Sequence, residues 1–173
     1  AGQLVKTMKL GTQIEGCVFD ETQGLLFVGE ENRGLWKFAY HDEAPAAVLI
    51  DEIGSATGLV ADVEGVTLWR GKEGGGLLVA SAQSANRFIV YDPQWPHAHR
   101  GSFSIVANPE LGIDEVTHTD GLDIFSGALP GWPRGIVIVQ DDGNPQSGVD
   151  QNFKVASWAE IEAALNLPQY EAE

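Results

Sequence analysis

The sequence contains one cysteine, Cys17, among 173 residues. An intrachain disulfide is therefore impossible, which excludes the small disulfide-stapled folds. The apolar residues Val18 and Phe19 follow Cys17 directly. This context predicts a small side chain in the core rather than a catalytic nucleophile.

Basic residues are also scarce. Lys and Arg number 10 against 25 Asp and Glu, and the formal net charge is −15. This charge repels nucleic acid and anionic membrane surfaces, so no partner of either kind is expected. No apolar run approaches the roughly 18 residues of a membrane span, and residues 1–10 lack a signal-peptide core. A solvated acidic surface explains most of the charge. The alternative is a cation site.

Several catalytic motifs are absent. The sequence has no His-Glu-x-x-His, no Gly-x-Ser-x-Gly and no P-loop. His97 and His99 lie two residues apart, but no further zinc-type ligands accompany them. The acidic segment 114–123 lacks the ligand spacing of an EF-hand. These absences argue against the common zinc, serine and nucleotide chemistries.

Short apolar runs of strand length are present throughout the chain. They span 24–29, 34–38, 47–50, 76–80, 87–91 and 135–139. Each is rich in β-branched or aromatic residues and is flanked by Gly, Asp or Asn. Helical periodicity occurs only near the C-terminus, where Ser157 and Glu160 match a capping box and Pro168 stops the pattern. The fold class predicted is all-β with a short C-terminal helix.

Three segments of the chain repeat one another. In each, an acid-Gly pair opens an apolar strand: Glu15-Gly16, Glu64-Gly65 and Asp120-Gly121. The pairs are roughly 50 residues apart, and a second and a third strand follow each of them. A period near 50 residues with about four strands per unit is typical of propeller blades.

The repeat predicts a single incomplete β-propeller domain over residues 1–173. Its four-stranded blades span approximately 12–55, 61–110 and 116–158. Propellers usually close with four to eight blades, so three cannot form the usual ring. Either the chain is part of a longer one or another molecule completes the circle, and open blade edges favour such pairing.

The acids at the strand heads are expected to meet at one mouth of the central channel. Glu15, Glu64 and Asp120 open the innermost strands, and Glu31, Gln83 and Asp141 end the second strands. Hard oxygen ligands without clustered Cys or His favour calcium. The alternative is that these are ordinary turn residues, since Asp-Gly and Glu-Gly commonly punctuate strand ends.

Seven segments, taken in order, carry a resemblance to a known family. They are GTQIEG, FVGEENRGLWKF, DVEGVTLW, ASAQSANRFIVYD, DEVTHTDGLDI, VQDDGN and QNFKVASW. From about Lys9 to Leu167 the chain resembles the C-terminal half of the β-propeller phytases, the calcium-dependent alkaline phytases of bacteria. The resemblance implies a six-bladed fold, of which this chain supplies about three blades.

The resemblance also implies an activity. In the family, several calcium ions at one mouth bind phytate, myo-inositol hexakisphosphate. One phosphate occupies a cleavage site and a neighbour occupies an affinity site. A calcium-bound water attacks phosphorus directly, because the metal neutralises phosphate oxygens and lowers the pKa of water. The family further implies a secreted or periplasmic hydrolase acting on phytate or other inositol phosphates.

Site residues follow from the resemblance motif by motif. The residues expected to carry catalysis are Glu15, Glu64 and Asp120. The substrate positions expected are Glu31, Gln83 and Arg33. The calcium ligands expected are Glu15, Glu31, Asp62, Glu64, Gln83, Asp114, Asp120, Asp141 and Asn144. Gly143 stands where a family member has an acid, which is a departure within the last of these loops.

Three functions remain open on the sequence. The family's phosphate-gripping Lys and Arg come largely from the N-terminal half, which this chain lacks. A ring completed by a homodimer or by an N-terminal half-propeller would be a phytase. An incomplete propeller could instead bind calcium and phosphorylated ligands without turnover and assist a full phytase domain. A different calcium propeller hydrolase, such as a lactonase, is the third reading, and the ordered phytase motifs argue against it.

Overall fold

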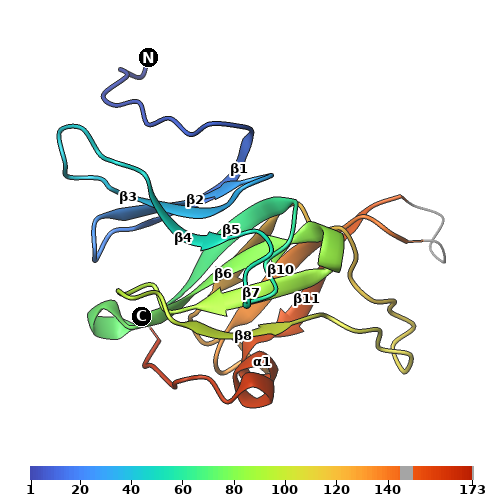
Figure 1. Ribbon diagram of the computed structural model, residues 1–173. Helices are drawn as coiled ribbons and strands as arrows, with labels where there is room; N and C mark the ends of the chain where they lie inside the picture. The colour runs from blue at the N-terminus through green and yellow to red at the C-terminus, as the bar shows by residue number, and fades with distance from the viewer. Residues whose placement is uncertain (145–149, 173) are drawn as a thin grey trace.

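The computed structural model describes residues 1–144 and 150–172; residues 145–149 of the predicted third blade lie outside this range. The first sheet is antiparallel and its strands follow chain order, as Figure 1 shows. They are β1 (Ile14–Asp20), β2 (Leu25–Glu30), β3 (Gly34–Ala39) and β4 (Val48–Glu52). This is the up-and-down order of a propeller blade.

The second sheet has the same order, and the third has three strands within the described residues. The second consists of β5 (Val63–Arg70), β6 (Gly76–Ala82), β7 (Arg87–Tyr91) and β8 (His99–Phe103). The third consists of β9 (Leu122–Phe125), β10 (Ile136–Asp141) and β11 (Asn152–Ser157). Short 3-10 turns, η1 (Lys72–Gly74) and η2 (Gln83–Ala85), flank β6. The predicted fold class, all-β with partial propeller blades, is confirmed.

The first strands of the three sheets lie next to one another. β5 contacts β1 on one side and β9 on the other. Two apolar cores fill the spaces between the sheets. One packs Phe27 and Leu35 of the first sheet against Leu78 and Ile89 of the second. The other packs Trp69 and neighbours of the second sheet against the third sheet.

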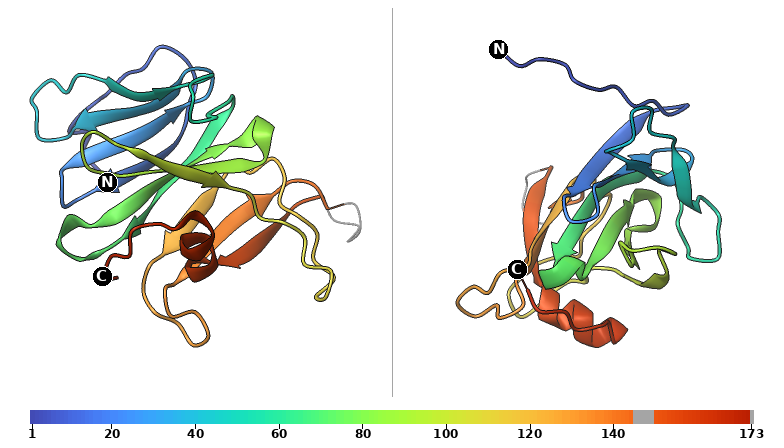
Figure 2. Two further views of the ribbon diagram at one scale, coloured as in Figure 1. Left: turned by 60° about the horizontal axis from the view of Figure 1, so that its bottom comes forward. Right: turned by 90° about the vertical axis from the view of Figure 1, so that its left-hand side faces the viewer.

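The only α-helix of the described residues, α1 (Trp158–Leu165), lies beside β8, β10 and β11 (Figure 2). Trp158 is fully buried, and its ring stacks on that of Trp69 at 6.3 Å between centroids. Ser157 occupies the N-cap position as predicted, but its side chain makes no capping hydrogen bond. The helix ends at Asn166, whose left-handed conformation terminates it before Pro168.

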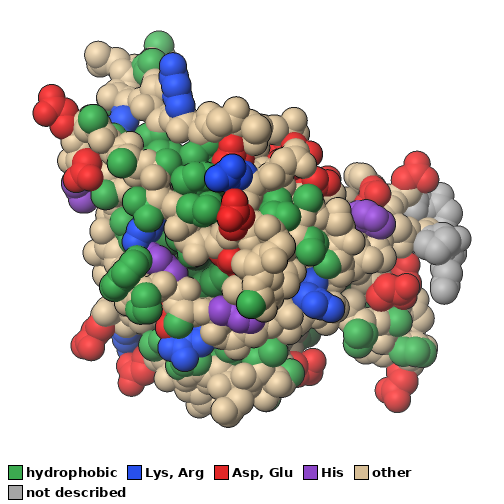
Figure 3. All heavy atoms as spheres, viewed as in Figure 1, with side chains coloured by type: hydrophobic (Ala, Val, Ile, Leu, Met, Phe, Trp, Pro, Cys, Tyr) green, Lys and Arg blue, Asp and Glu red, His purple; other side chains and the backbone are tan. Residues whose placement is uncertain are grey.

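The surface agrees with the composition. Acidic side chains are spread over the face in Figure 3, and basic ones are few. The prediction for Cys17 was wrong, because its side chain is exposed on β1. Within the described residues, no helix has both the length and the hydropathy needed to cross a membrane.

The glycines of the first two acid-Gly pairs, Gly16 and Gly65, allow two innermost strands to approach closely. A Cβ on Gly16 would lie 2.5 Å from the carbonyl oxygen of Glu64. A Cβ on Gly65 would lie 2.7 Å from the carbonyl oxygen of Asp120 and would also strike Leu122. Real Cβ atoms do not approach backbone this closely. The repeat therefore encodes blade-to-blade packing as well as an acidic strand head.

Gly121 provides a matched control for this packing, because a Cβ there meets nothing within 4 Å. We expect Gly65→Ala to cost about 1–3 kcal/mol of unfolding free energy, as overpacking typically does. Gly121→Ala should stay within about 0.5 kcal/mol of the parent when the chain is monomeric. Urea unfolding of dilute protein checks both values. Equal stability of the two variants would contradict the role given to Gly65.

Candidate functional site

Two of the three acid-Gly pairs, Glu15-Gly16 and Glu64-Gly65, lie where the ladder between the first and second strands is interrupted. The β1–β2 register shifts between Ile14 and Cys17, and the β5–β6 register shifts between Val63 and Val66. Such bulges re-aim side chains at the end of a sheet. They occur at the strand heads that carry Glu15 and Glu64.

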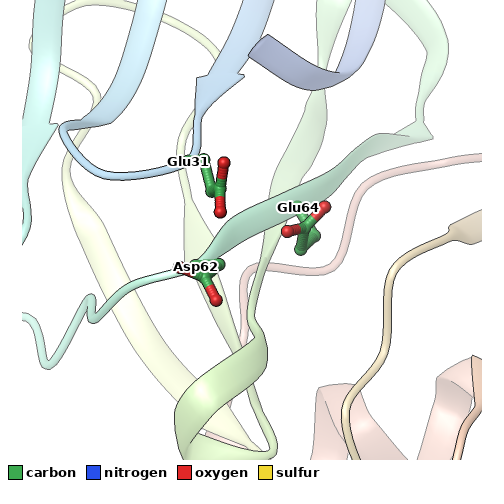
Figure 4. Close-up of side chains that lie close together, drawn as sticks. All are labelled: Glu31, Asp62 and Glu64. Atoms are coloured by element: carbon green, nitrogen blue, oxygen red, sulfur yellow. The ribbon is translucent and has the colours of Figure 1, made fainter. Parts of the chain in front are cut away.

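Three carboxylates from two neighbouring sheets gather at this end. Glu31 follows β2, while Asp62 and Glu64 lie at the head of β5, as Figure 4 shows. One oxygen from each lies within 4.8 Å of the others. All three side chains are at least partly exposed, although Glu64 has only 9% of its surface accessible. These three residues form the mouth cluster.

Backbone hydrogen bonds fix the segments that carry the mouth cluster. The Val63 amide donates to the Glu31 carbonyl at 3.0 Å, which ties the first sheet to the second. The Gln83 amide donates to the Asp62 carbonyl at 3.0 Å. The Glu31 amide donates to the Gln13 carbonyl at 3.0 Å. The cluster is thus positioned by main-chain contacts rather than by its own side chains.

The remaining predicted strand-head acids border the mouth cluster. The Gln83 side-chain amide donates to an Asp120 carboxylate oxygen. The Asp120 amide donates to the Gln140 side-chain oxygen at 2.8 Å, which links β10 to the start of β9. Glu15 accepts a 2.5 Å hydrogen bond from the side chain of Gln13. Gln140 was not among the predicted site residues; its place at the end of the second strand, matching Gln83, was the available signal.

The mouth cluster carries several negative charges close together. Burial is the largest cause that raises the pKa of Glu64, and together with the surrounding carboxylates of Glu15, Asp120, Glu31 and Asp62 it brings this pKa to about 7. Within the described residues, no ion pair is formed by Glu31, Asp62 or Glu64. A bound cation would therefore remove repulsion at this place.

A family model described as Phytase matches residues 1–170. The chain belongs to the phytase family. A 3-phytase of Bacillus subtilis (strain 168) is 34% identical over 163 residues, which is 92% of this chain. The match covers 42% of the Bacillus protein, so this phytase-family chain spans less than half the length of that relative.

Two further predicted calcium ligands of the phytase-family chain surround a buried lysine. The Lys154 ammonium lies 2.7 Å from Asp114 and 2.5 Å from Asp141. It also donates to the Glu115 carbonyl at 2.8 Å. Asp141 is fully buried and accepts the Thr117 amide at 2.7 Å with its other oxygen. The ammonium thus supplies a positive charge to both carboxylates.

Sequence reasoning missed Lys154, although a signal was present. Lys154 interrupts the apolar strand pattern of Phe153 and Val155, and a lysine at an inward position needs anionic partners. Burial lowers the pKa of Lys154, but hydrogen bonds and the charges of Asp114 and Asp141 outweigh burial and raise it overall. Lys154 is therefore charged at every physiological pH.

The last two predicted site residues lie outside the mouth cluster. Asn144 is buried, and its side chain donates to the Asp141 carbonyl at 3.3 Å and accepts from Asn152. Arg33 lies in the turn between β2 and β3 and forms a 3.5 Å ion pair with Glu52. Both partners of that pair are more than half exposed, so it contributes little to stability.

The raised pKa of Glu64 has a measurable consequence for the metal-free protein. A carboxyl whose pKa is higher in the folded state contributes stability at low pH and loses it as pH rises through the folded value. In chelator, stability should therefore fall between about pH 4.5 and pH 7 because of Glu64. Glu64→Gln should be more stable than the parent at pH 8 and similar at pH 4.5. Thermal unfolding at the two pH values checks this, and an identical pH profile for both proteins would contradict it.

Proposed function

We propose that this chain provides the calcium-binding mouth of a phytase and takes part in calcium-dependent hydrolysis of phytate phosphomonoesters. The observation that carries the proposal is the mouth cluster of Glu31, Asp62 and Glu64, with oxygens within 4.8 Å of one another. Membership of the phytase family supports the substrate class.

The chemistry of the mouth cluster fits calcium. Its three ligand atoms are all carboxylate oxygens. The side chains of Gln83 and Gln140, which each carry an amide oxygen, form hydrogen bonds with neighbouring Asp120. Calcium takes six to eight oxygen ligands in flexible geometry, whereas zinc and copper favour nitrogen and sulfur. Bound calcium would supply charge neutralisation of phosphate oxygens and a water of lowered pKa.

The chain's own residues would do the positioning. Glu31, Asp62 and Glu64 hold the cation, and Glu15 and Asp120 add negative charge beside it. Gln83 keeps Asp120 at the mouth through its hydrogen bond. Asp141 and Asn144 shape the neighbouring loop of the third sheet. Arg33 is the substrate contact, because its weak surface ion pair with Glu52 leaves its guanidinium able to turn toward a phosphate.

The proposed active form is a closed ring. Three sheets leave the mouth open on one side, and propellers close with four to eight blades. Further blades, from a second copy or from an N-terminal half-propeller, would complete it and bring basic residues to the phosphates. By analogy with the family, the protein would act as a secreted or periplasmic hydrolase.

Phosphate release from phytate tests the proposal directly. Purified chain should release inorganic phosphate with calcium and should not do so in chelator. Absence of release under both conditions, with calcium binding retained, would favour a second candidate function: a non-catalytic module that binds calcium and phosphorylated ligands. The observation behind that candidate is that the chain corresponds to 42% of a phytase relative. Absence of calcium binding would contradict both.

A further inference from the structure

The third sheet has a free edge beside an apolar groove. Within the described residues β11 pairs with β10 only, while the first two sheets each carry a fourth strand outside their third. A groove of about 950 Å³ runs along this edge, and every residue of β11 lines it. Its apolar walls include Phe103, Ile105, Trp132, Phe153, Val155 and Ile161. An unpaired strand next to an apolar groove is a site for β-strand addition.

The order of strands identifies the missing neighbour. The outermost strand of one sheet leads directly into the innermost strand of the next: β4 leads into β5, and β8 leads into β9. The segment that precedes β1 should therefore be the outermost strand of the preceding sheet in a ring. That segment is residues 1–10, which form no helix or strand here.

The N-terminal segment already runs in the required direction. Lys6 donates to the carbonyls of Tyr40 and Asp42, at the end of the sheet where β4 begins. Thr12 contacts the Glu30 side chain at the opposite end, where β4 finishes. The segment thus runs along the first sheet from the end where β4 begins to the end where β4 finishes, which is the direction of β4 itself (Figure 1).

The composition of this segment matches the groove. Leu4 and Val5 are 82% and 80% exposed, which is unusual for apolar side chains unless a partner covers them. Residues 1–14 contain Lys6 and Lys9 and no acid, in a chain of net charge −15. The groove is lined by Asp114, Lys154 and Glu160, and since Lys154 is paired with Asp114 at 2.7 Å, the carboxylate of Glu160 gives the groove a net negative charge. The segment and the groove are complementary in charge and in apolar character.

The innermost strand of the third sheet, β9, also has room for a neighbouring first sheet. Gly16 and Gly65 each touch the head of the next innermost strand, but a Cβ on Gly121 would meet nothing. The outward face of the third sheet is apolar too, with Phe125 52% and Ile138 39% exposed. A first sheet placed beside it would seat its β1 against Gly121 and its residues 4–8 against β11.

The reach of the chain permits both contacts at once. The outermost strand of one sheet lies three strand spacings and one sheet-to-sheet spacing from the innermost strand of the next, about 17 Å in all. The six Cα steps from residue 8 to residue 14 span up to about 20 Å when extended.

We propose that two copies of this chain close a six-sheet ring in which residues 4–8 of each copy add to β11 of the other as its fourth strand. The arrangement has twofold symmetry, and each N-terminal segment is exchanged. This dimer rests on the ring closure described under the proposed function. Its test measures mass and cross-linking, whereas the test of the proposed function measures phosphate release, so either proposal can fail without the other.

Light scattering of the full chain in calcium and about 150 mM salt tests the ring. The expected mass is about 37 kDa, twice the 18.6 kDa of the chain. Thr7→Pro removes an amide and fixes the backbone, so it should weaken dimerisation at least tenfold. Thr7→Ala is the matched control and should dimerise like the parent. A monomer at every concentration, an open series of larger oligomers, or equal dimerisation of both variants would overturn the proposal.

Two further variants separate strand exchange from other dimers. Gly121→Ala, which should leave the monomer's stability unchanged, should weaken the dimer because a partner strand would meet its Cβ. In a Cys17→Ser background, Thr7→Cys with Val155→Cys should give disulfide-linked dimers on non-reducing gels. A link formed within one chain, or no link under oxidation, would overturn the exchange.

Discussion

Glu64→Gln is expected to reduce calcium-dependent phosphate release from phytate by at least about a hundredfold. Partners that only orient metal ligands typically cost 10–100-fold when they are changed, and Glu64 is proposed as a ligand itself. Glu64 is the least exposed of the mouth-cluster residues and is surrounded by four other carboxylates. Its carboxylate is therefore expected to contribute more to the free energy of cation binding than any other in the cluster, and the substitution removes that contribution. Steady-state phosphate release at saturating calcium measures the effect.

The matched control for this substitution is Glu110→Gln, which removes the same charge from an exposed loop. It should leave phosphate release within about twofold of the parent, since exposed charges at a distance are screened. The fold of Glu64→Gln is checked by its thermal unfolding, which the raised pKa of Glu64 predicts to be improved at pH 8 in chelator. A stable Glu64→Gln with full activity would remove Glu64 from the proposed site.

Lys154→Met is expected to destabilise the protein more than any surface substitution. The change leaves Asp141, which is fully buried, without its ammonium partner. Breaking a buried ion pair from one side typically costs about 3–5 kcal/mol. For a chain of this length that corresponds to a fall in Tm of about 10 °C. Thermal unfolding in chelator measures the change without interference from calcium.

Two comparisons make the Lys154 result specific. Lys72→Met removes an exposed ammonium from an ion pair with Glu171 and should cost less than about 1 kcal/mol. Adding Asp141→Asn to Lys154→Met removes the orphaned charge and should recover part of the loss. If Lys72→Met and Lys154→Met unfold at the same temperature, Lys154 does not neutralise the buried carboxylates as described.

The strand-head acids could be predicted from sequence because their signal is local and repeated. Each acid-Gly pair opens an apolar strand, and the period near 50 residues places the strands in equivalent positions. The structure adds the reason for the glycine: Gly16 and Gly65 pack against the backbone of the next strand. Spacing along the chain was enough to expect Glu15, Glu64 and Asp120 near one another.

Other features depend on contacts between distant segments, which periodicity does not report. Lys154 reaches Asp114 across 40 positions of sequence, so its role becomes visible only in the folded chain. Cys17 sits in an apolar stretch, but its side chain is exposed, and no sheet of the described residues covers the face of β1 that carries it. Its exposure depends on how the sheets are arranged rather than on the local sequence.

A crystal structure of the protein grown with calcium would show whether the mouth cluster binds the ion. We expect an ion bound by oxygens of Glu31, Asp62 and Glu64 at about 2.3–2.6 Å, the usual calcium–oxygen distance. Lys154 should still lie between Asp114 and Asp141. A mouth cluster that stays empty at saturating calcium would overturn the proposed calcium site.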